Sequence, residues 1–490
     1  MKKVLIIGGG VAGLTAGIFL QKQGFSCEIV EQNAVAGGNL CGWERSGHRI
    51  DNCVHWLTGT REGTPLYALW QEIGALSGER DVCRLPSFYA SSDGEKQIAF
   101  SRDLHETRAA FHAVSPQDHR ATDRFFDAAR QISRSISSPR AGDSLREAAV
   151  ALAYGRKDLR TVASEFRSPL LRHALTDLLT GEYSSLGLLF AYGAFAAGNA
   201  DLPAGGSAVM ASRIENRFRS LGGTLHLGIK ARKLLLRGGR VQELLTDQGS
   251  VTADGFIVAT DPAAAFGRLL PAELLPGRRS EGYHGEDAFP IYSAFQAAFS
   301  VETAALPFCG ICGIPIEPLG TDGRLITRLP LRSFSYEPGF APEGRTVLQV
   351  MVFQHRPACR DWIESRKEDR AAYDAHKQAL AEAVASRIKS ALPATESSLR
   401  LLDCWTPASY RRYLSVCDGA FMSPAITGKR IPFPPSGTLP GISNLQLAGQ
   451  WYRVPGGLPS AAMSGKAAAE RLASRLRGTS KNCRTAPSLS

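Results

Sequence analysis

The first thirty-one residues alternate between apolar and glycine-rich stretches in the order of a βαβ unit. Residues 4–7 (VLII) form a short aliphatic run, which predicts a buried parallel strand. A glycine-rich turn follows, and residues 12–22 predict a helix that closes at Gly24. A second apolar strand over residues 26–31 ends on Glu31. The pattern predicts an α/β domain that opens with a parallel sheet.

The turn after the first strand has the spacing G-x-G-x-x-G. Gly8 permits the tight turn, Gly10 lets the backbone approach a pyrophosphate, and Gly13 lets the helix pack closely on the strand. The amides at the start of that helix point at the same phosphate. Glu31 stands where a carboxylate binds the ribose hydroxyls, and no Arg follows it, which disfavours NADP. The residues therefore predict a dinucleotide site with contacts from Gly8, Gly10, Val11, Ala12, Gly13, Glu31 and Gln32.

A second pair of glycines follows Glu31, at Gly37 and Gly38, and residues 47–51 (GHRID) and His55 come next. Here the chain resembles the phytoene desaturase, carotenoid isomerase and retinol saturase group of the flavin amine oxidase superfamily. In that group the second pair helps to enclose the pyrophosphate of FAD. The resemblance thus implies FAD, with further contacts from Gly37, Gly38, Asn39 and His55.

The chain departs from the pattern of that group at two positions. Asn39 stands where an Arg is usual, and Cys53 replaces the glycine of the later stretch. The first departure removes a side chain that would contact a phosphate.

The resemblance recurs at separate places along the chain. Residues 202–206 (LPAGG) look like the family's Pro-x-Gly-Gly turn, and residues 208–221 predict an amphipathic helix. Residues 225–231 resemble the strand that meets the adenine, and residues 241–262 resemble a β-meander that returns to the FAD sheet. Residues 335–344 look like a turn of the family's second domain. These matches imply cofactor contacts at Ala231 and Ala259.

The last match lies near the C-terminus. Residues 444–450 (NLQLAGQ), 455–459 (PGGLP) and 464–468 (SGKAA) resemble the family's closing motif. That motif comprises a strand, a glycine-rich turn against the flavin and a final helix, here over about residues 458–476. Its implied cofactor contacts are Gly449, Gly457, Leu458 and Pro459.

The implied fold is α/β, with a Rossmann-like FAD-binding domain of the glutathione reductase type and an interleaved α+β substrate domain. The FAD domain, a parallel sheet plus β-meander, comprises residues 1–64, 201–274 and 436–477. The substrate domain comprises residues 65–200 and 275–435, and residues 478–490 are expected to be a disordered tail. Within the substrate domain, the pattern predicts helices from Ser115 through Arg172, strands over 289–299 and 345–352, and a helix over 368–392.

Composition narrows the class of protein only slightly. The 57 Lys and Arg exceed the 46 Asp and Glu, which favours anionic ligands or surfaces without naming one, and nothing indicates nucleic acid. The start lacks the apolar core of a secretory signal, and the apolar stretch 186–197 is too short to span a bilayer core of roughly 30 Å.

Ten scattered cysteines are typical of a reducing cytoplasm. Cys309 and Cys312 have metal or redox spacing, but no second ligand pair follows, so we expect no metal site.

The catalytic residues are the least defined part of the prediction. The sequence offers no Ser-His-Asp arrangement and no paired carboxylates at telling spacing. Three side chains beside the flavin-directed motifs are candidates to face the substrate, although packing alone also places such side chains beside loops: His55, Trp451 and Tyr452.

We expect an FAD-dependent oxidoreductase that moves hydride between a carbon–carbon bond of an apolar, isoprenoid-like substrate and the flavin. A flavin-dependent cis–trans isomerase of a polyene and a catalytically silent flavin-binding protein remain alternatives. Residues 130–172 carry nine basic and four acidic residues, and the apolar stretch 186–197 follows. These two stretches indicate either peripheral contact with an anionic membrane or a basic helical face beside a core helix or tunnel wall.

Overall fold

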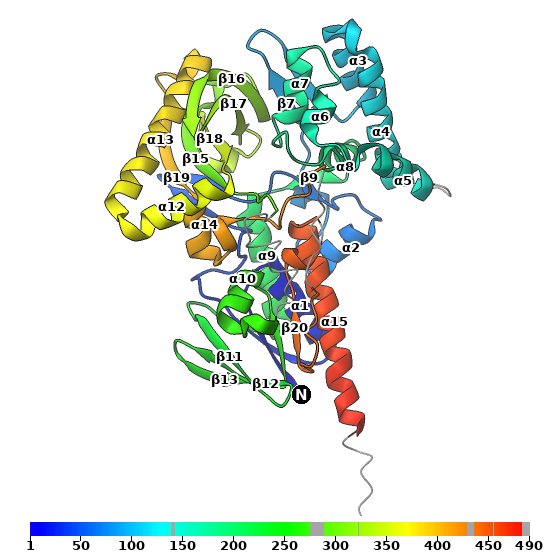
Figure 1. Ribbon diagram of the computed structural model, residues 1–490, viewed down its shortest axis with the longest axis vertical. Helices are drawn as coiled ribbons and strands as arrows, with labels where there is room; N and C mark the ends of the chain where they lie inside the picture. Colours follow the sequence, from blue (N-terminus) through cyan, green and yellow to red (C-terminus); the bar gives the residue numbers. More distant parts are fainter. Residues whose placement is uncertain (139–142, 275–288, 322, 429–435, 454, 483–490) are drawn as a thin grey trace, which may run out of the picture.

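The computed structural model describes residues 1–138, 143–274, 289–321, 323–428, 436–453 and 455–482. Figure 1 shows a lower lobe around a parallel sheet, with two units above it, one built on a mixed sheet and one of helices. Segments from the two ends of the chain meet in the lower lobe, where α1 (Val11–Lys22) lies beside α15 (Leu458–Asn482).

Five parallel strands form the centre of the lower lobe, in the order β10-β2-β1-β14-β20. Their bounds are β1 Lys3–Ile7, β2 Ser26–Val30, β10 Thr224–His226, β14 Gly255–Val258 and β20 Leu445–Leu447. Val4 and Ile6 of β1 pack on the side of α1, and Leu5 and Ile7 pack on the opposite side. Because both faces are covered, the strand is an unbroken apolar run rather than an alternating one.

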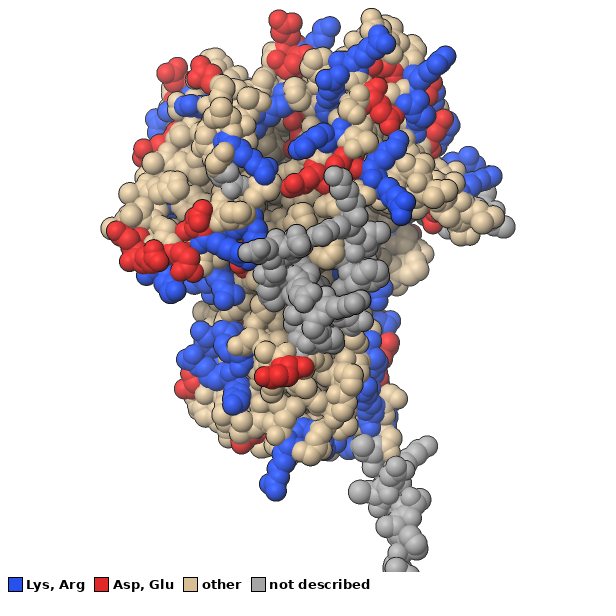
Figure 2. Space-filling model, in the orientation of Figure 1, with Lys and Arg blue, Asp and Glu red and all other residues tan. Residues whose placement is uncertain are grey.

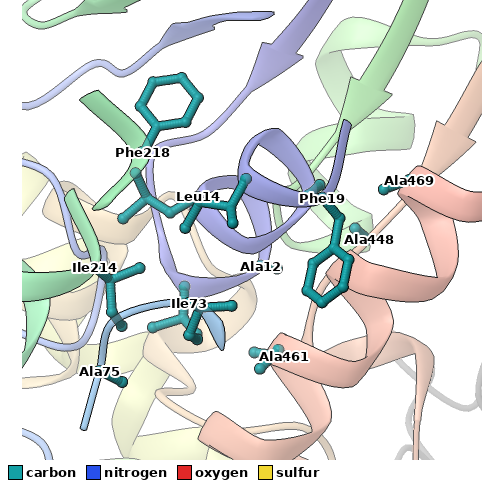
Figure 3. Packing of buried hydrophobic residues seen from close by; sticks show 14 of the residues in the cluster. Ala12, Leu14, Phe19, Ile73, Ala75, Ile214, Phe218, Ala448, Ala461 and Ala469 are labelled. Atoms are coloured by element: carbon teal, nitrogen blue, oxygen red, sulfur yellow. The ribbon is translucent and has the colours of Figure 1, made fainter. Parts of the chain in front are cut away.

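Three helices cover one face of this sheet, namely α1, α9 (Gly206–Ser220) and α15. Their packing is close because small residues lie at the crossings, as Figure 3 shows for Ala12, Ala461 and Ala469. A Cβ on Gly17 would lie 2.5 Å from the Phe218 ring, and one on Gly465 would lie 2.3 Å from the Ala12 carbonyl oxygen. These glycines therefore set the distance between the helices.

A three-stranded antiparallel meander covers the other face: β11 (Ala231–Arg237), β12 (Arg240–Thr246) and β13 (Gly249–Thr252). This arrangement corrects the predicted strand over residues 225–231. β10 ends at His226, Gly228 adopts φ +71°, and Ala231 begins the meander. Residues 225–231 (LHLGIKA) alternate between apolar and other positions as a single strand would, and this pattern conceals the change of sheet.

The upper mixed sheet has seven strands in the order β19-β15-β18-β17-β16-β7-β8. Their bounds are β7 Ser87–Ser92, β8 Gln97–Ser101, β15 Ala294–Glu302, β16 Gly310–Thr321, β17 Arg324–Ser333, β18 Arg345–Phe353 and β19 Arg400–Trp405. Helices α12 (Arg356–Glu368) and α13 (Arg370–Ala391) lie beside it, as Figure 1 shows.

Two element boundaries in this unit differ from the prediction. The strand expected over 289–299 begins at Ala294. The helix expected over 368–392 starts at Arg370, because Asp369 is its N-cap and accepts a hydrogen bond from the Ala372 amide (2.9 Å). Cys312 lies within β16, so the Cys309–Cys312 pair does not open a helix, as a redox pair normally would.

The helical unit begins earlier than the sequence predicts. Ser115 precedes a 3-10 turn (Pro116–Asp118) between two helices rather than opening the first one. The helices are α3 Leu104–Val114, α4 His119–Ser137, α5 Asp143–Tyr154, α6 Leu159–Ala163, α7 Pro169–Thr176 and α8 Ser185–Ala196. A buried ion pair joins this unit to the mixed sheet, with Arg328 Nε 2.7 Å from Asp177 Oδ1.

The remaining elements are short connections between the units. They are β3 Gly42–Arg45, β4 His48–Asp51, β5 Leu57–Thr58, α2 Pro65–Glu72, β6 Val82–Cys83, β9 Ala200–Pro203, α10 Pro262–Ala264 and α14 Pro407–Leu414.

Two expected domain limits shift in the structure. Helix α2 was expected in the substrate domain, but Tyr67, Leu69 and Trp70 pack in the same core as α1 and α9. At the C-terminus, α15 continues to Asn482, so residues 478–482 of the expected disordered tail are helical. The rest of that tail, residues 483–490, lies outside the described residues.

Candidate functional site

A cavity of about 1140 Å³ extends from the glycine-rich turn after β1 into the helical unit. This volume exceeds the 300–1,000 Å³ that is typical of a site for one small molecule. We call the part between β1, β2, the meander and the start of α15 the nucleotide arm. We call the part between α5, α8, Tyr183 and Tyr292 the apolar arm. The cavity is therefore larger than the usual site for one small molecule.

The glycines of the first turn are present for different physical reasons. Gly8 adopts φ +105°, and a Cβ there would lie 2.7 Å from the Ala259 carbonyl oxygen. A Cβ on Gly13 would lie 2.0 Å from the Gly8 carbonyl oxygen, so Gly13 serves packing and does not line the cavity. Gly10 does line it, and the nearest atoms to a Cβ there are 3.9 Å away. No contact within the described part of the chain therefore requires a glycine at position 10. The free space beside it is the space that a ligand phosphate would occupy.

The second glycine pair closes over the first turn. The Gly37 amide donates to the Gly9 carbonyl oxygen (2.8 Å), and Gly38 adopts φ +62°. Gly37, Gly38 and Asn39 all line the nucleotide arm. Two backbone segments thus face the same space with no side chain at the glycines, as a pyrophosphate site requires.

Asn39 and Cys53, the two positions that depart from the family pattern, contact each other. Asn39 Nδ2 lies 3.7 Å from Cys53 Sγ, and Asn39 Oδ1 accepts a hydrogen bond from Asn52 Nδ2 (2.9 Å). Burial raises the pKa of the Cys53 thiol well above its ordinary value. The thiol is therefore protonated and neutral beside the amide.

Glu31 is buried, with 7% of its surface exposed, and lines the nucleotide arm. Its Oε2 accepts from the Gly9 amide (2.8 Å), and its Oε1 accepts from the amide (2.9 Å) and Nδ2 (2.8 Å) of Asn33. Burial raises the pKa of the carboxyl group, and these hydrogen bonds act in the opposite direction. A carboxylate has about four acceptor positions, so one remains for a ligand hydroxyl.

The far end of the nucleotide arm contains residues that sequence reasoning missed. Ala231, Ala259 and Gln32 line it as expected, but so do residues 413–416, at the C-terminal end of α14. Gln32 Nε2 donates to the Tyr413 carbonyl oxygen (2.9 Å), which attaches that loop to the end of β2. Asp261 also lines the arm, and burial raises its pKa to about 6. The loop lies more than 380 positions from β2 in sequence, so no local pattern signals it.

The closing motif forms the wall opposite the first turn. Gly449, Gly457, Leu458 and Pro459 line the cavity, and α15 begins at Leu458, so its first amides face the cavity. The Gly457 amide donates to Gln450 Oε1 (2.9 Å), and Gly457 adopts φ +91°. Trp451 lines the cavity, whereas Tyr452 is not among the described lining residues and packs in the core beneath the meander. Of these two candidate residues, the structure brings only Trp451 to the site.

His55, the third candidate, lines the cavity where the two arms meet. Its Nδ1 lies 3.2 Å from the Cys53 carbonyl oxygen. Burial, together with the charge of Arg332, lowers the pKa of His55 to about 3. The imidazole is therefore neutral at physiological pH and cannot act as a cationic acid there.

Arg332, which lowers that pKa, is a residue that the sequence did not single out. It lies on β17 with 7% of its surface exposed, and its Nη2 donates to the Tyr336 hydroxyl (2.8 Å). Its guanidinium lies 4.3 Å from the centre of the Phe334 ring. Within the described residues it forms no ion pair. A buried positive charge thus lies close to His55 and Cys53.

Helix α8 has two roles in the apolar arm. Leu188, Leu189 and Tyr192 are buried in the core of the helical unit. Other α8 side chains face the cavity, where they meet rings and aliphatic groups from separate parts of the chain: Trp56, Ile136, Leu179, Tyr183, Leu186, Phe190, Ala191, Ala194, Tyr292, Phe421 and Met422. The stretch 186–197 is therefore both a core helix and a cavity wall.

Comparison with known proteins agrees with this geometry. A family model described as flavin containing amine oxidoreductase matches residues 11–473. The chain belongs to this family. It is therefore a flavin-containing oxidoreductase by family.

The chain is similar over its whole length to carotenoid-related proteins at low identity. It is 24% identical to a phytoene dehydrogenase of Streptomyces griseus, over 96% of this chain and 94% of that protein. It is 21% identical to a chloroplastic prolycopene isomerase of Daucus carota, over 96% and 80%. Its fold is similar to that of an oxidoreductase from Methanosarcina mazei, with a TM-score of 0.62 and 15% identity over 96% of this chain and 100% of that chain.

Within the described residues, every helix is too short or too polar to cross a bilayer. The cytoplasmic location stays a prediction from the cysteine content.

Proposed function

We propose that this protein is an FAD-dependent oxidoreductase that transfers hydride between a carbon–carbon bond of an apolar, isoprenoid or polyene substrate and the flavin. The observation that carries the proposal is the continuity of the two arms. A glycine-walled nucleotide arm and a long apolar arm form one cavity, and they meet at His55. A ligand in the apolar arm would therefore reach a flavin without crossing polar surface.

FAD rather than a smaller flavin is supported by the length of the nucleotide arm. It extends from the closing motif at Gly457 to Glu31 and Ala231, so its lining includes positions for a flavin ring, a pyrophosphate, a ribose and an adenine. Residues Gly10, Gly37 and Gly38 would hold the pyrophosphate, and Glu31 would hold the ribose. When bound, FAD supplies the hydride acceptor or donor.

The chain's own contribution is to position the substrate and exclude water. Tyr183 and Tyr292 pack against each other, with ring centres 4.4 Å apart, and burial raises the pKa of both hydroxyls, so they stay neutral. His55 is neutral as well. The described lining of the apolar arm thus has no ionised acid or base deep inside, so the proton that leaves the carbon beside the hydride donor would pass to a neutral group such as His55.

An amine substrate, which the family name also allows, is less well supported. The carboxylates among the described lining residues are Glu31 and Asp261, and both lie in the nucleotide arm. A protonated amine in the apolar arm would lose its hydration without a carboxylate in exchange, which costs several kcal/mol. The walls therefore favour an uncharged substrate.

The two reactions on a polyene differ in the mass of the product. Holoenzyme would be incubated with a polyene and an artificial electron acceptor, and the molecular mass of the extracted polyene would be measured by mass spectrometry. Loss or gain of two hydrogens supports the oxidoreductase. An unchanged mass with an altered absorption spectrum supports the isomerase, a candidate favoured by the similarity to prolycopene isomerase. A bound flavin that no substrate changes would indicate the silent protein.

A further inference from the structure

Helix α5 is unusual in exposing its apolar side chains. Leu145 is 76% exposed and Leu152 is 86% exposed. They are seven positions apart, so they lie on the same face of the helix two turns from each other. The alanines between and beside them are also exposed, at positions 148, 149, 151 and 153. The helix thus presents an apolar ridge that no described residue covers.

This ridge lies at an opening of the apolar arm. Leu152 and Ala151 line the cavity, as does Phe190 of α8, which is 43% exposed. Seven large apolar side chains are exposed in the described part of the chain, and Leu145, Leu152 and Phe190 are three of them. Leu152 and Phe190 both line the cavity, and Leu145 lies two turns from Leu152 on the same helix, which is more than the scatter of single apolar residues that any protein surface carries.

The surroundings of the ridge are basic. Arg134 and Arg156 are exposed and, within the described residues, form no ion pair. Other cations of the unit are neutralised, such as Lys157 and Arg124 by Glu165. In Figure 2 the edge of the helical unit at the right is mainly uncharged, with blue Lys and Arg side chains above it. An apolar ridge with flanking cations is the composition of a surface that binds anionic lipid.

We propose that α5, Phe190 and the two flanking arginines, Arg134 and Arg156, form a docking surface for an anionic lipid bilayer. Leu145 and Leu152 enter the acyl region, and the arginines contact the headgroups. The opening beside Leu152 then faces the bilayer, so an apolar substrate passes from the lipid into the cavity without crossing water. This passage rests on the proposed function, whereas the docking does not.

A bilayer fits this surface better than a second protein does. A protein partner would need a complementary groove and at least about 1,000 Å² of buried surface. A twelve-residue helix with alanines between two leucines is a narrow convex ridge, and the exposed arginines around it would lose hydration in a protein interface. In a bilayer the leucines are buried while the arginines stay at the hydrated headgroups.

The test uses the holoenzyme and vesicles of phosphatidylcholine with or without phosphatidylglycerol, separated by flotation. We expect the wild type to float with the anionic vesicles and less with phosphatidylcholine alone, and high salt to release it. The variant Leu145→Glu/Leu152→Glu should lose about tenfold or more of this binding, since two apolar contacts are lost and two negative charges are added. The matched control is Leu325→Glu, because Leu325 is 73% exposed on β17, away from α5.

Three results would overturn the docking proposal. The first is that the wild type does not bind the anionic vesicles. The second is that the Leu325→Glu control loses as much vesicle binding as Leu145→Glu/Leu152→Glu. The third is that light scattering shows a wild-type dimer and a monomeric Leu145→Glu/Leu152→Glu variant. Flavin content and circular dichroism show whether each variant is folded. The flavin response to a polyene in detergent is measured separately. If the Leu145→Glu/Leu152→Glu variant loses vesicle binding but keeps the flavin response, the docking proposal alone is confirmed. If the wild type binds vesicles but shows no flavin response to the polyene, the proposed function alone is contradicted.

Discussion

Asn39 Nδ2 lies 3.7 Å from the sulfur of Cys53, so the two positions at which the chain departs from the family pattern form one contact. A longer Arg side chain in place of Asn39 would extend beyond this contact, and a glycine in place of Cys53 would remove the contacting side chain. The two departures are therefore physically linked rather than independent.

This contact predicts coupling between the two positions. Asn39→Arg alone should weaken FAD binding, and Asn39→Arg/Cys53→Gly should recover it, with a coupling energy of about 0.5–3 kcal/mol as for other residues in contact. Titration of the apoprotein with FAD, followed by flavin fluorescence, measures each variant. Additive effects of the two substitutions would show that the positions act separately.

The glycines at positions 10 and 13 should fail in different ways. Gly10→Val should fold but lose FAD, because its side chain would project into the cavity and meets no protein atom closer than 3.9 Å. Gly13→Val should fail to fold, because its Cβ would lie 2.0 Å from the Gly8 carbonyl oxygen. Circular dichroism and flavin absorbance of the purified variants separate the two effects. A yellow Gly10→Val protein would contradict the assignment of the pyrophosphate position.

Glu31→Ala should weaken FAD binding by roughly 1.5–3 kcal/mol, the range for hydrogen bonds to a charged group. Part of any loss comes from the Gly9 and Asn33 amides, which would lose their acceptor. Glu31→Gln is the matched variant, since it keeps one acceptor oxygen and should lose less. Equal affinity in the wild type and both variants would mean that Glu31 does not contact the cofactor.

His55 should make the apoprotein less stable in acid. Its pKa is about 3 in the folded state against 6.5 for the exposed side chain, so the unfolded chain binds more protons between these values. The free energy of unfolding therefore rises with pH from about 3 to about 6.5, and His55→Gln should reduce this rise by about 1–3 kcal/mol. Urea titrations at several pH values measure it. The same slope in both proteins would show that His55 is protonated normally in the folded state.

Gly187 offers a way to narrow the apolar arm without disturbing the fold. It lies on α8, lines the cavity, and has no atom within 4 Å of a Cβ built on it. Gly187→Trp should keep FAD and slow flavin reduction by a long polyene about tenfold, an effect of about 1.4 kcal/mol. Gly187→Ala, the control, should react like the wild type. An unchanged rate in Gly187→Trp would mean that the substrate does not pass α8.

The sequence predicts the parts of this structure that depend on neighbouring residues. The βαβ unit follows from the run at residues 4–7 and the spacing of Gly8, Gly10 and Gly13, and the same spacing locates the nucleotide arm. The switch of sheets before Ala231 was missed because residues 225–231 alternate between apolar and other positions as one continuous strand would. The start of α13 was missed because only the Asp369 side-chain hydrogen bond fixes it.

The missed site residues come from distant segments of the chain. Arg332 approaches His55 from β17, and residues 413–416 close the nucleotide arm from the C-terminal end of α14. Nothing in the sequence around Arg332 distinguishes it from the 56 other Lys and Arg of the chain. The position of Leu152 at the opening likewise depends on how α5 packs against α8. Such residues are found only once the fold brings the segments together.

The central claim is that one cavity holds FAD and an apolar substrate in contact. The most direct measurement is anaerobic mixing of the holoenzyme with the lipid fraction or the water-soluble fraction of the producing cells, followed by flavin absorbance. We expect the lipid fraction alone to change the absorbance, by bleaching oxidised FAD in a desaturase or reoxidising reduced FAD in a saturase. A change driven only by water-soluble metabolites, with no response to lipid, would contradict it.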